Sequence, residues 1–135
     1  MTVLMAGPLA LALDGAGEVA SLRDEAGGVE YCPPDQPGPL LRLTVEGNSL
    51  APSGAEWAAE AGALRLRYGD AGPTAVVKVA RKPTHLTFEL IAVEGAQPTV
   101  ADWGPIATTI GETVGATVGV VRNARFALGI QGLNI

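Results

Sequence analysis

Apolar and polar residues alternate along much of the chain. The clearest example is the run 63–68, where Leu64, Leu66 and Tyr68 occupy alternate positions and arginines lie between them. Side chains at alternate positions of a strand point to the same face, so such a run predicts a strand with one buried and one solvated face. Four runs carry this pattern: 40–46, 63–68, 74–82 and 85–93.

Further short strands are predicted wherever β-prone residues lie between turn signals. Glycine, proline, asparagine and aspartate separate the runs, and the brief Pro83-Thr84 link predicts a hairpin between its two neighbours. Closely spaced strands of this kind indicate an all-β fold, here an antiparallel β-sandwich of roughly ten short strands. The additional strands are expected at 9–13, 18–23, 28–31, 56–59, 116–122 and 125–130.

One segment departs from this pattern. Ile106, Ile110 and Val114 are four residues apart, which would place them on one side of a helix. We therefore predict one short helical turn near 106–114, although Gly111 inside it weakens a helix by about 1 kcal/mol relative to alanine.

Composition limits the organisation and the partners of the chain. Its 135 residues suit a single domain, 1–135, and 18 glycines with 10 prolines favour turns over long helices. A net charge of −5 argues against a nucleic acid or an anionic membrane, because a phosphate-binding face needs excess Lys and Arg. No apolar run is long enough for a membrane-spanning helix.

The N-terminus lacks the basic region of a signal peptide. A cytoplasmic location is expected on that ground, although a secreted chain whose signal peptide had been removed would look the same. The apolar end of the sequence, 129–135, suggests either a piece of a longer protein or a segment that pairs with another chain.

Residues able to perform nucleophilic or metal chemistry are few. Cys32 and His85 are the only cysteine and the only histidine, and they lie far apart in the sequence. No phosphate-binding loop, Ser-His arrangement or calcium-loop spacing is present. We therefore expect no catalytic residue, no metal site and no cofactor.

Paired carboxylates are the remaining route to catalysis, because glycosidases hold two of them across the scissile bond. Asp102 and Glu112 bracket the irregular segment, and Asp24, Glu25 and Glu30 form another acidic group. Exposed loop charges explain the same residues, and the sequence places no pair across a cleft. No catalytic pair is assigned.

Aromatic side chains could stack against a sugar face. Trp57 and Trp103 are the candidates for a ligand-binding platform. Tyr68 lies on the same side of its predicted strand as Leu64 and Leu66, so it is expected in the core. The alternative for either tryptophan is a buried position that closes the sandwich.

The last third of the chain carries several motifs in a block. They are Asp102–Ile106 (DWGPI), Thr108–Glu112 (TTIGE), Val118–Asn123 (VGVVRN) and Ala127–Asn134 (ALGIQGLN). Together with the opening Gly17–Asp24 (GEVASLRD) and Pro39–Leu43 (PLLRL), this block resembles the N-terminal β-sandwich, a mutarotase-like supersandwich, of large bacterial carbohydrate-active enzymes of the glycoside hydrolase type.

The resemblance implies that the catalytic carboxylates belong to a later domain. This chain would then be a non-catalytic domain that supports the catalytic domain or forms one wall of the sugar cleft. Arg122, Asn123, Gln131 and Asn134 would offer donors and acceptors to sugar hydroxyls. Turn capping and a domain interface are the alternative roles of these four residues.

Two other functions remain open from the sequence. A self-standing carbohydrate-binding module would use Trp57 or Trp103 as its platform. A structural or assembly protein would pair with another chain through its C-terminal strand. The expected partners are accordingly a downstream catalytic domain, a second chain or a glycan.

Overall fold

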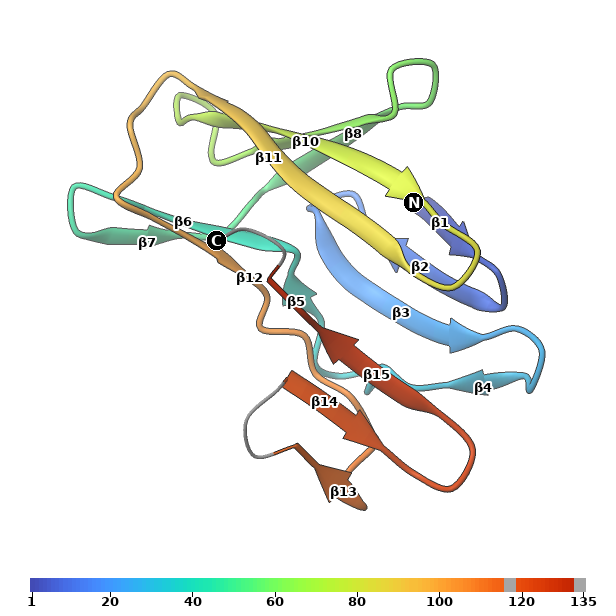
Figure 1. Ribbon diagram of the computed structural model, residues 1–135. Helices are drawn as coiled ribbons and strands as arrows, with labels where there is room; N and C mark the ends of the chain where they lie inside the picture. The colour runs from blue at the N-terminus through green and yellow to red at the C-terminus, as the bar shows by residue number, and fades with distance from the viewer. Residues whose placement is uncertain (116–118, 133–135) are drawn as a thin grey trace.

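Strands make up the regular secondary structure of the computed structural model, which describes residues 1–115 and 119–132 (Figure 1). No residue in these two ranges is helical. In chain order the strands are β1 (Thr2–Ala6), β2 (Leu9–Leu13), β3 (Glu18–Asp24), β4 (Val29–Glu30), β5 (Gly38–Pro39), β6 (Leu41–Val45), β7 (Asn48–Leu50), β8 (Gly54–Ala58), β9 (Ala63–Arg67), β10 (Thr74–Arg81), β11 (Leu86–Glu94), β12 (Val100–Trp103), β13 (Thr113–Val114), β14 (Gly119–Arg122) and β15 (Ala127–Ile130).

The strands form four antiparallel sheets. The first sheet has the order β1-β2-β3-β4, with β5 also paired to β3. The second has the order β11-β10-β9-β8 and the third β12-β6-β7. The fourth, β13-β14-β15, lies at the far end of the molecule from the second (Figure 1).

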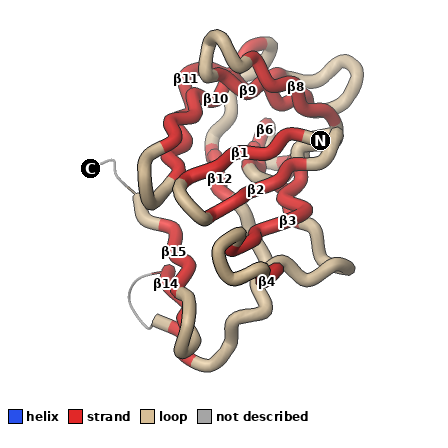
Figure 2. Tube along the Cα trace, turned by 90° about the vertical axis from the view of Figure 1, so that its right-hand side faces the viewer, coloured by secondary structure: helices blue, strands red, loops and turns tan. Residues whose placement is uncertain are grey.

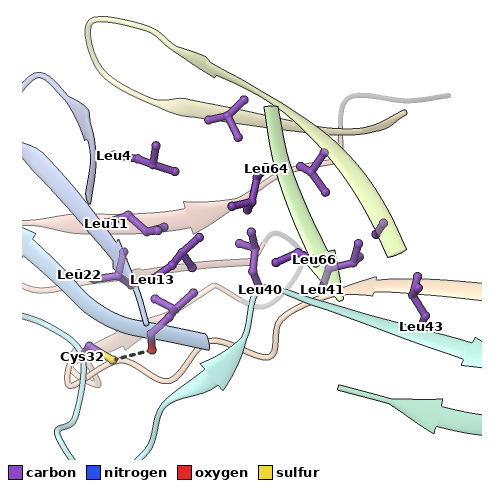
Figure 3. Packing of buried hydrophobic residues seen from close by; sticks show 14 of the residues in the cluster. Leu4, Leu11, Leu13, Leu22, Cys32, Leu40, Leu41, Leu43, Leu64 and Leu66 are labelled. Atoms are coloured by element: carbon purple, nitrogen blue, oxygen red, sulfur yellow. Dashed lines mark hydrogen bonds between the residues drawn. The ribbon is translucent and has the colours of Figure 1, made fainter. Parts of the chain in front are cut away.

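A leucine-rich core lies between the first and second sheets. Leu4 and Leu13 of the first sheet and Leu64 and Leu66 of the second are fully buried in one cluster (Figure 3). The third sheet adds Leu41 to the same cluster. The cluster explains the alternation in the sequence, because one face of each of these strands leaves water and the other does not.

The all-β sandwich-like fold is thus confirmed. Leu64, Leu66 and Tyr68 are buried, while Arg65 and Arg67 between them are exposed. The ten predicted strands correspond to strands of the structure, and residues 116–118 of the run 116–122 lie outside the described residues. The Pro83-Thr84 link does join a hairpin, formed by β10 and β11.

The helical turn expected near 106–114 is wrong, because the segment is extended and irregular and ends in β13. The Thr108 hydroxyl accepts a hydrogen bond from the Ile110 amide at 3.2 Å, a local bond that competes with a helical turn. The chain also crosses closely over Gly38, where a side chain would collide with the Pro105 carbonyl. Ile110 is buried in the core and Ile106 packs against it, but both belong to extended chain and not to a helical face.

Removing one core leucine tests this packing. Leu64→Ala should lower the free energy of unfolding by about 2–5 kcal/mol, because it leaves a cavity where both main sheets meet. Val3→Ala removes a half-exposed side chain from β1 and should change stability by about 0.5 kcal/mol or less. Urea titration of both variants measures the difference, and equal costs would contradict the assigned core.

Candidate functional site

A hollow of about 1690 Å³ opens on one side of the sandwich. Core residues Leu11, Leu22 and Leu40 reach its wall, so the hollow is continuous with the packed interior. Three of the four sheets supply the rest of its edge, through β11, β12 and the hairpin of β14 and β15. The core is therefore closed by sheets on most sides and accessible on this one.

An aromatic pair marks the wall of the hollow. Phe88 of β11 and Trp103 of β12 have ring centroids 6.0 Å apart and tilted by 42°, a geometry typical of attractive aromatic contacts. Trp103 retains 36% of its surface exposed, and Phe88 is only half-buried. Both rings therefore offer apolar surface that the protein leaves open.

A second aromatic contact fixes the hairpin of β14 and β15 against the first sheet. Phe126 in the turn stacks on Tyr31, with centroids 4.8 Å apart and planes within 15°. The Tyr31 carbonyl also accepts a hydrogen bond from the Thr109 amide at 2.8 Å. These contacts hold Leu128 of β15 at the hollow, beside Phe126.

A smaller, polar recess lies in the fourth sheet. Its volume is about 520 Å³, and Arg122, Arg125 and Glu112 bring charges of both signs to it. Arg125 also borders the hollow, so the two openings are neighbours. The recess could take a polar group such as a sugar hydroxyl.

The structure describes five of the six predicted ligand-binding residues and distributes them over three places. Arg122 and Asn123 border the recess, whereas Trp103 and Gln131 border the hollow. Trp57 lies in β8, half-buried against the core, and does not line either opening. Asn134 lies outside the described residues.

Asn123 has a structural task as well. Its side-chain oxygen accepts hydrogen bonds from the amides of Arg125 and Phe126, both at 2.8 Å. These bonds fold the β14–β15 turn, which is the capping role that the sequence left open. Only its amide nitrogen is then left to face a ligand.

In the part of the chain that the structure describes, no hydrogen bond joins the side chains of Cys32, His85 and Tyr68 to one another. Cys32 is buried, and burial together with the negative charge of Glu30 raises the pKa of its thiol. His85 is exposed at the β10–β11 turn, where its ring contacts the Thr84 hydroxyl at 3.4 Å. Burial likewise raises the pKa of Tyr68, whose hydroxyl donates to the Leu41 carbonyl at 2.8 Å in the core.

Glu30 is the carboxylate with the most protein partners around it. It accepts hydrogen bonds from the Ser21 hydroxyl and from the amides of Leu22, at 2.9 Å, and Cys32, at 3.1 Å. Partial desolvation raises the pKa of Glu30, but these hydrogen bonds outweigh it and hold the pKa below its ordinary value. Glu30 thus ties the end of β4 to β3, and its lone pairs are engaged in the fold.

Asp102 and Glu112, the other candidate carboxylates, are both exposed. Among residues 1–115 and 119–132, no three histidine, cysteine, aspartate or glutamate side chains gather in a way that could hold a metal ion. The same residues include no helix long and apolar enough to cross a membrane.

Comparison of the chain with protein-family models, with curated proteins and with solved structures finds no match. The geometry of the chain favours the hollow as its principal feature. The sequence indicated Trp103 as a candidate and placed Phe88 within the predicted strand 85–93, but no pattern in it showed that this apolar face is uncovered.

The hydrogen bonds of Glu30 give stability a dependence on pH. Because the pKa is lowered on folding, the carboxylate stabilises the protein above its unfolded value of 4.5, and this contribution is lost as the pH falls through the folded value. Glu30→Gln should therefore cost about 1 kcal/mol near pH 7 and less near pH 3.

Urea titrations of the wild-type chain and of Glu30→Gln at both pH values measure this difference. Glu60→Gln, which changes an exposed residue in a turn, is the matched control and should leave stability nearly unchanged. A cost for Glu30→Gln that is equal at the two pH values would contradict the assigned role.

Proposed function

We propose that this chain is a non-catalytic β-sandwich domain of a carbohydrate-active enzyme of the glycoside hydrolase type. It docks onto the catalytic unit, which it supports, or to which it contributes one wall of the sugar cleft. The observation that carries the proposal is the apolar hollow, in which core residues such as Leu11 share a wall with half-exposed aromatic rings.

The chemistry of the hollow supports docking to a polypeptide. Contiguous apolar surface left open on a folded domain marks an interaction site, and aromatic residues are enriched at the centres of such interfaces. Phe88 and Trp103 are aromatic and Leu128 is aliphatic, and the three come from three different sheets. A partner that covers them removes apolar surface from water, at about 25 cal/mol for each Å² buried.

The placement of the reactive side chains supports a non-catalytic role. The buried Cys32 thiol has a raised pKa, which disfavours the nucleophilic thiolate. Glu30 is engaged in hydrogen bonds within the fold, and His85 lies at an exposed turn. Catalysis needs such groups in mutual contact around a substrate.

The carbohydrate-active part of the proposal is based on the sequence resemblance carried by Asp102–Ile106 and the segments that follow it. Described residues of those segments border both openings, among them Trp103 and Leu128 at the hollow and Arg122 at the recess. The domain would therefore present to its partner the part of the chain in which the resemblance is strongest.

A self-standing carbohydrate-binding module is the second candidate. Trp103 favours it, because this ring is 36% exposed and has Phe88 beside it. Its position inside a hollow that is larger than the roughly 300–1,000 Å³ of ordinary ligand pockets favours the docking function instead.

Co-expression tests the proposal. The purified chain should cleave none of a panel of aryl glycosides and polysaccharides. Co-expressed with the polypeptide encoded directly downstream of it, the chain should form a stable complex that does cleave a glycan. Glycan cleavage by the chain alone, or a complex without such activity, would contradict the proposal.

Affinity electrophoresis in glycan-containing gels distinguishes the carbohydrate-binding module from the docking function. The binding module predicts that the gel retains the wild-type chain and the Trp57→Ala variant but not the Trp103→Ala variant. The docking function predicts no retention of either variant or of the wild-type chain.

A further inference from the structure

The hollow meets the edges of two strands and not only their faces. A cavity against one face of a strand touches alternate residues, because successive side chains point to opposite faces. This hollow is lined by the consecutive residues 84–90 of the β11 region and 125–132 of the β15 region. Both strands lie on the same side of the molecule, the left side in Figure 2. We call this part of the hollow the slot.

The main-chain groups of β11 alternate in direction. In an antiparallel pair, residues that bond to the partner strand alternate with residues whose N–H and C=O point away from it. The Lys82 amide donates to the His85 carbonyl at 2.9 Å, which marks this pair as a bonded one. By alternation Leu86, Phe88 and Leu90 direct their main-chain groups away from β10.

A separate hydrogen bond confirms which residues of β11 direct their main-chain groups away from β10. Val79 is opposite Phe88 in the ladder, and the Val79 amide donates to the Gly62 carbonyl at 2.9 Å, on the side away from β11. In the part of the chain that the structure describes, β11 pairs with β10 alone. No strand formed by the described residues therefore lies beside the outward groups of β11.

The edge of β15 likewise has main-chain groups that point away from its partner strand. The Asn123 amide donates to the Phe126 carbonyl at 3.0 Å, so alternation directs the main-chain groups of Ala127 and Gly129 away from β14. Within residues 1–115 and 119–132, β15 pairs only with β14. Two unpaired strand edges thus border one apolar slot.

We propose that an extended segment of the partner polypeptide, with apolar side chains at alternate positions, inserts into the slot and pairs with the free edge of β11. This proposal rests on the docking function above and names its mode, which is the addition of a strand to the second sheet. The apolar side chains of the segment would contact Phe88, Trp103 and Leu128, and its main chain would bond to Leu86, Phe88 and Leu90.

The residues of β11 fit an interface better than a solvent-exposed edge. Proteins protect long edge strands with lysine, proline or a bulge that turns the edge away. The nine residues of β11, LTFELIAVE, include neither lysine nor proline. The bulge in this pair of strands is on β11, where Ile91 is the extra residue between Leu90 and Ala92, so the stretch 86–90 that borders the slot lies before the bulge.

The same features disfavour a small apolar ligand. A ligand without donors and acceptors would cover the outward main-chain groups of β11 and leave them unpaired, at a cost of about 1–3 kcal/mol for each group. A strand pairs those groups and buries the aromatic rings at the same time.

Hydrogen exchange with a synthetic peptide tests the insertion. The probe is an acetylated and amidated peptide of alternating valine and threonine with lysine at each end, whose positive charge suits a chain of net charge −5. At saturating peptide, exchange of the Leu86, Phe88 and Leu90 amides should slow by at least about tenfold, equivalent to about 1.4 kcal/mol. The Thr87 and Glu89 amides, which face β10, should change little.

A peptide with N-methyl groups along one edge is the matched control. It keeps the apolar side chains but cannot donate along that edge, so it should protect these three amides much less. No slowing with millimolar unmodified peptide, or equal slowing with both peptides, would overturn the proposal.

Two variants of β11 provide a second readout. Phe88→Glu puts a charge at the wall of the slot, and it should weaken binding of the labelled peptide at least tenfold in fluorescence anisotropy. Ile91→Glu puts the same charge on an exposed position of the same strand that does not line the slot. Equal affinities of the two variants would overturn the proposal, and the wild-type exchange data remain decisive if Phe88→Glu does not fold.

These outcomes can be told apart from failure of the proposed function. Peptide binding at β11 with no glycan cleavage by the co-expressed complex would keep the strand-insertion mode and reject the carbohydrate-active assignment. Glycan cleavage by the complex without protection of β11 would keep the carbohydrate-active assignment and reject the strand-insertion mode.

Discussion

The structure depends on burial of one leucine cluster between two sheets that do not close completely around it. Leu4 and Leu13 on one side and Leu64 and Leu66 on the other are completely removed from water in this cluster. Burial of this kind is the dominant stabilising term in a domain of this size. The open side of the same cluster is the hollow, so stability and the proposed interaction surface have a common physical origin.

Two aromatic contacts determine how the sheets surround the hollow. The third sheet meets β11 through the contact of Phe88 with Trp103, and the fourth sheet meets the first through the stacking of Phe126 on Tyr31. These contacts position the boundaries of the opening without filling it. What is left is an apolar space bordered by main-chain donors and acceptors, which a strand satisfies better than an apolar ligand does.

The sequence predicted those parts of the fold in which a strand has one buried face. The alternation of Leu64, Leu66 and Tyr68 with arginines placed β9 and its core residues correctly. β1 was missed because Val3 and Met5, on its outer face, are apolar and exposed, which removes the alternation. The other strands that the sequence did not predict are β5, β7, β12 and β13.

Other features depend on contacts between distant segments. The spacing of Ile106 and Ile110 suggested a helix, but the local Thr108 bond and the crossing over Gly38 favour an extended chain. Trp103 was identified as a ligand-binding candidate, yet no pattern in its vicinity shows that its neighbour is Phe88. The free edge of β11 was equally beyond reach, because pairing is decided by which strands meet in space.

Native-state hydrogen exchange of the free chain measures the central claim most directly, because it reports whether the edge of β11 is open. An open edge predicts that the Leu86, Phe88 and Leu90 amides exchange much faster than the Thr87 and Glu89 amides between them, which bond to β10. Uniformly slow exchange along all five residues would show that the edge is already covered, and would contradict the account.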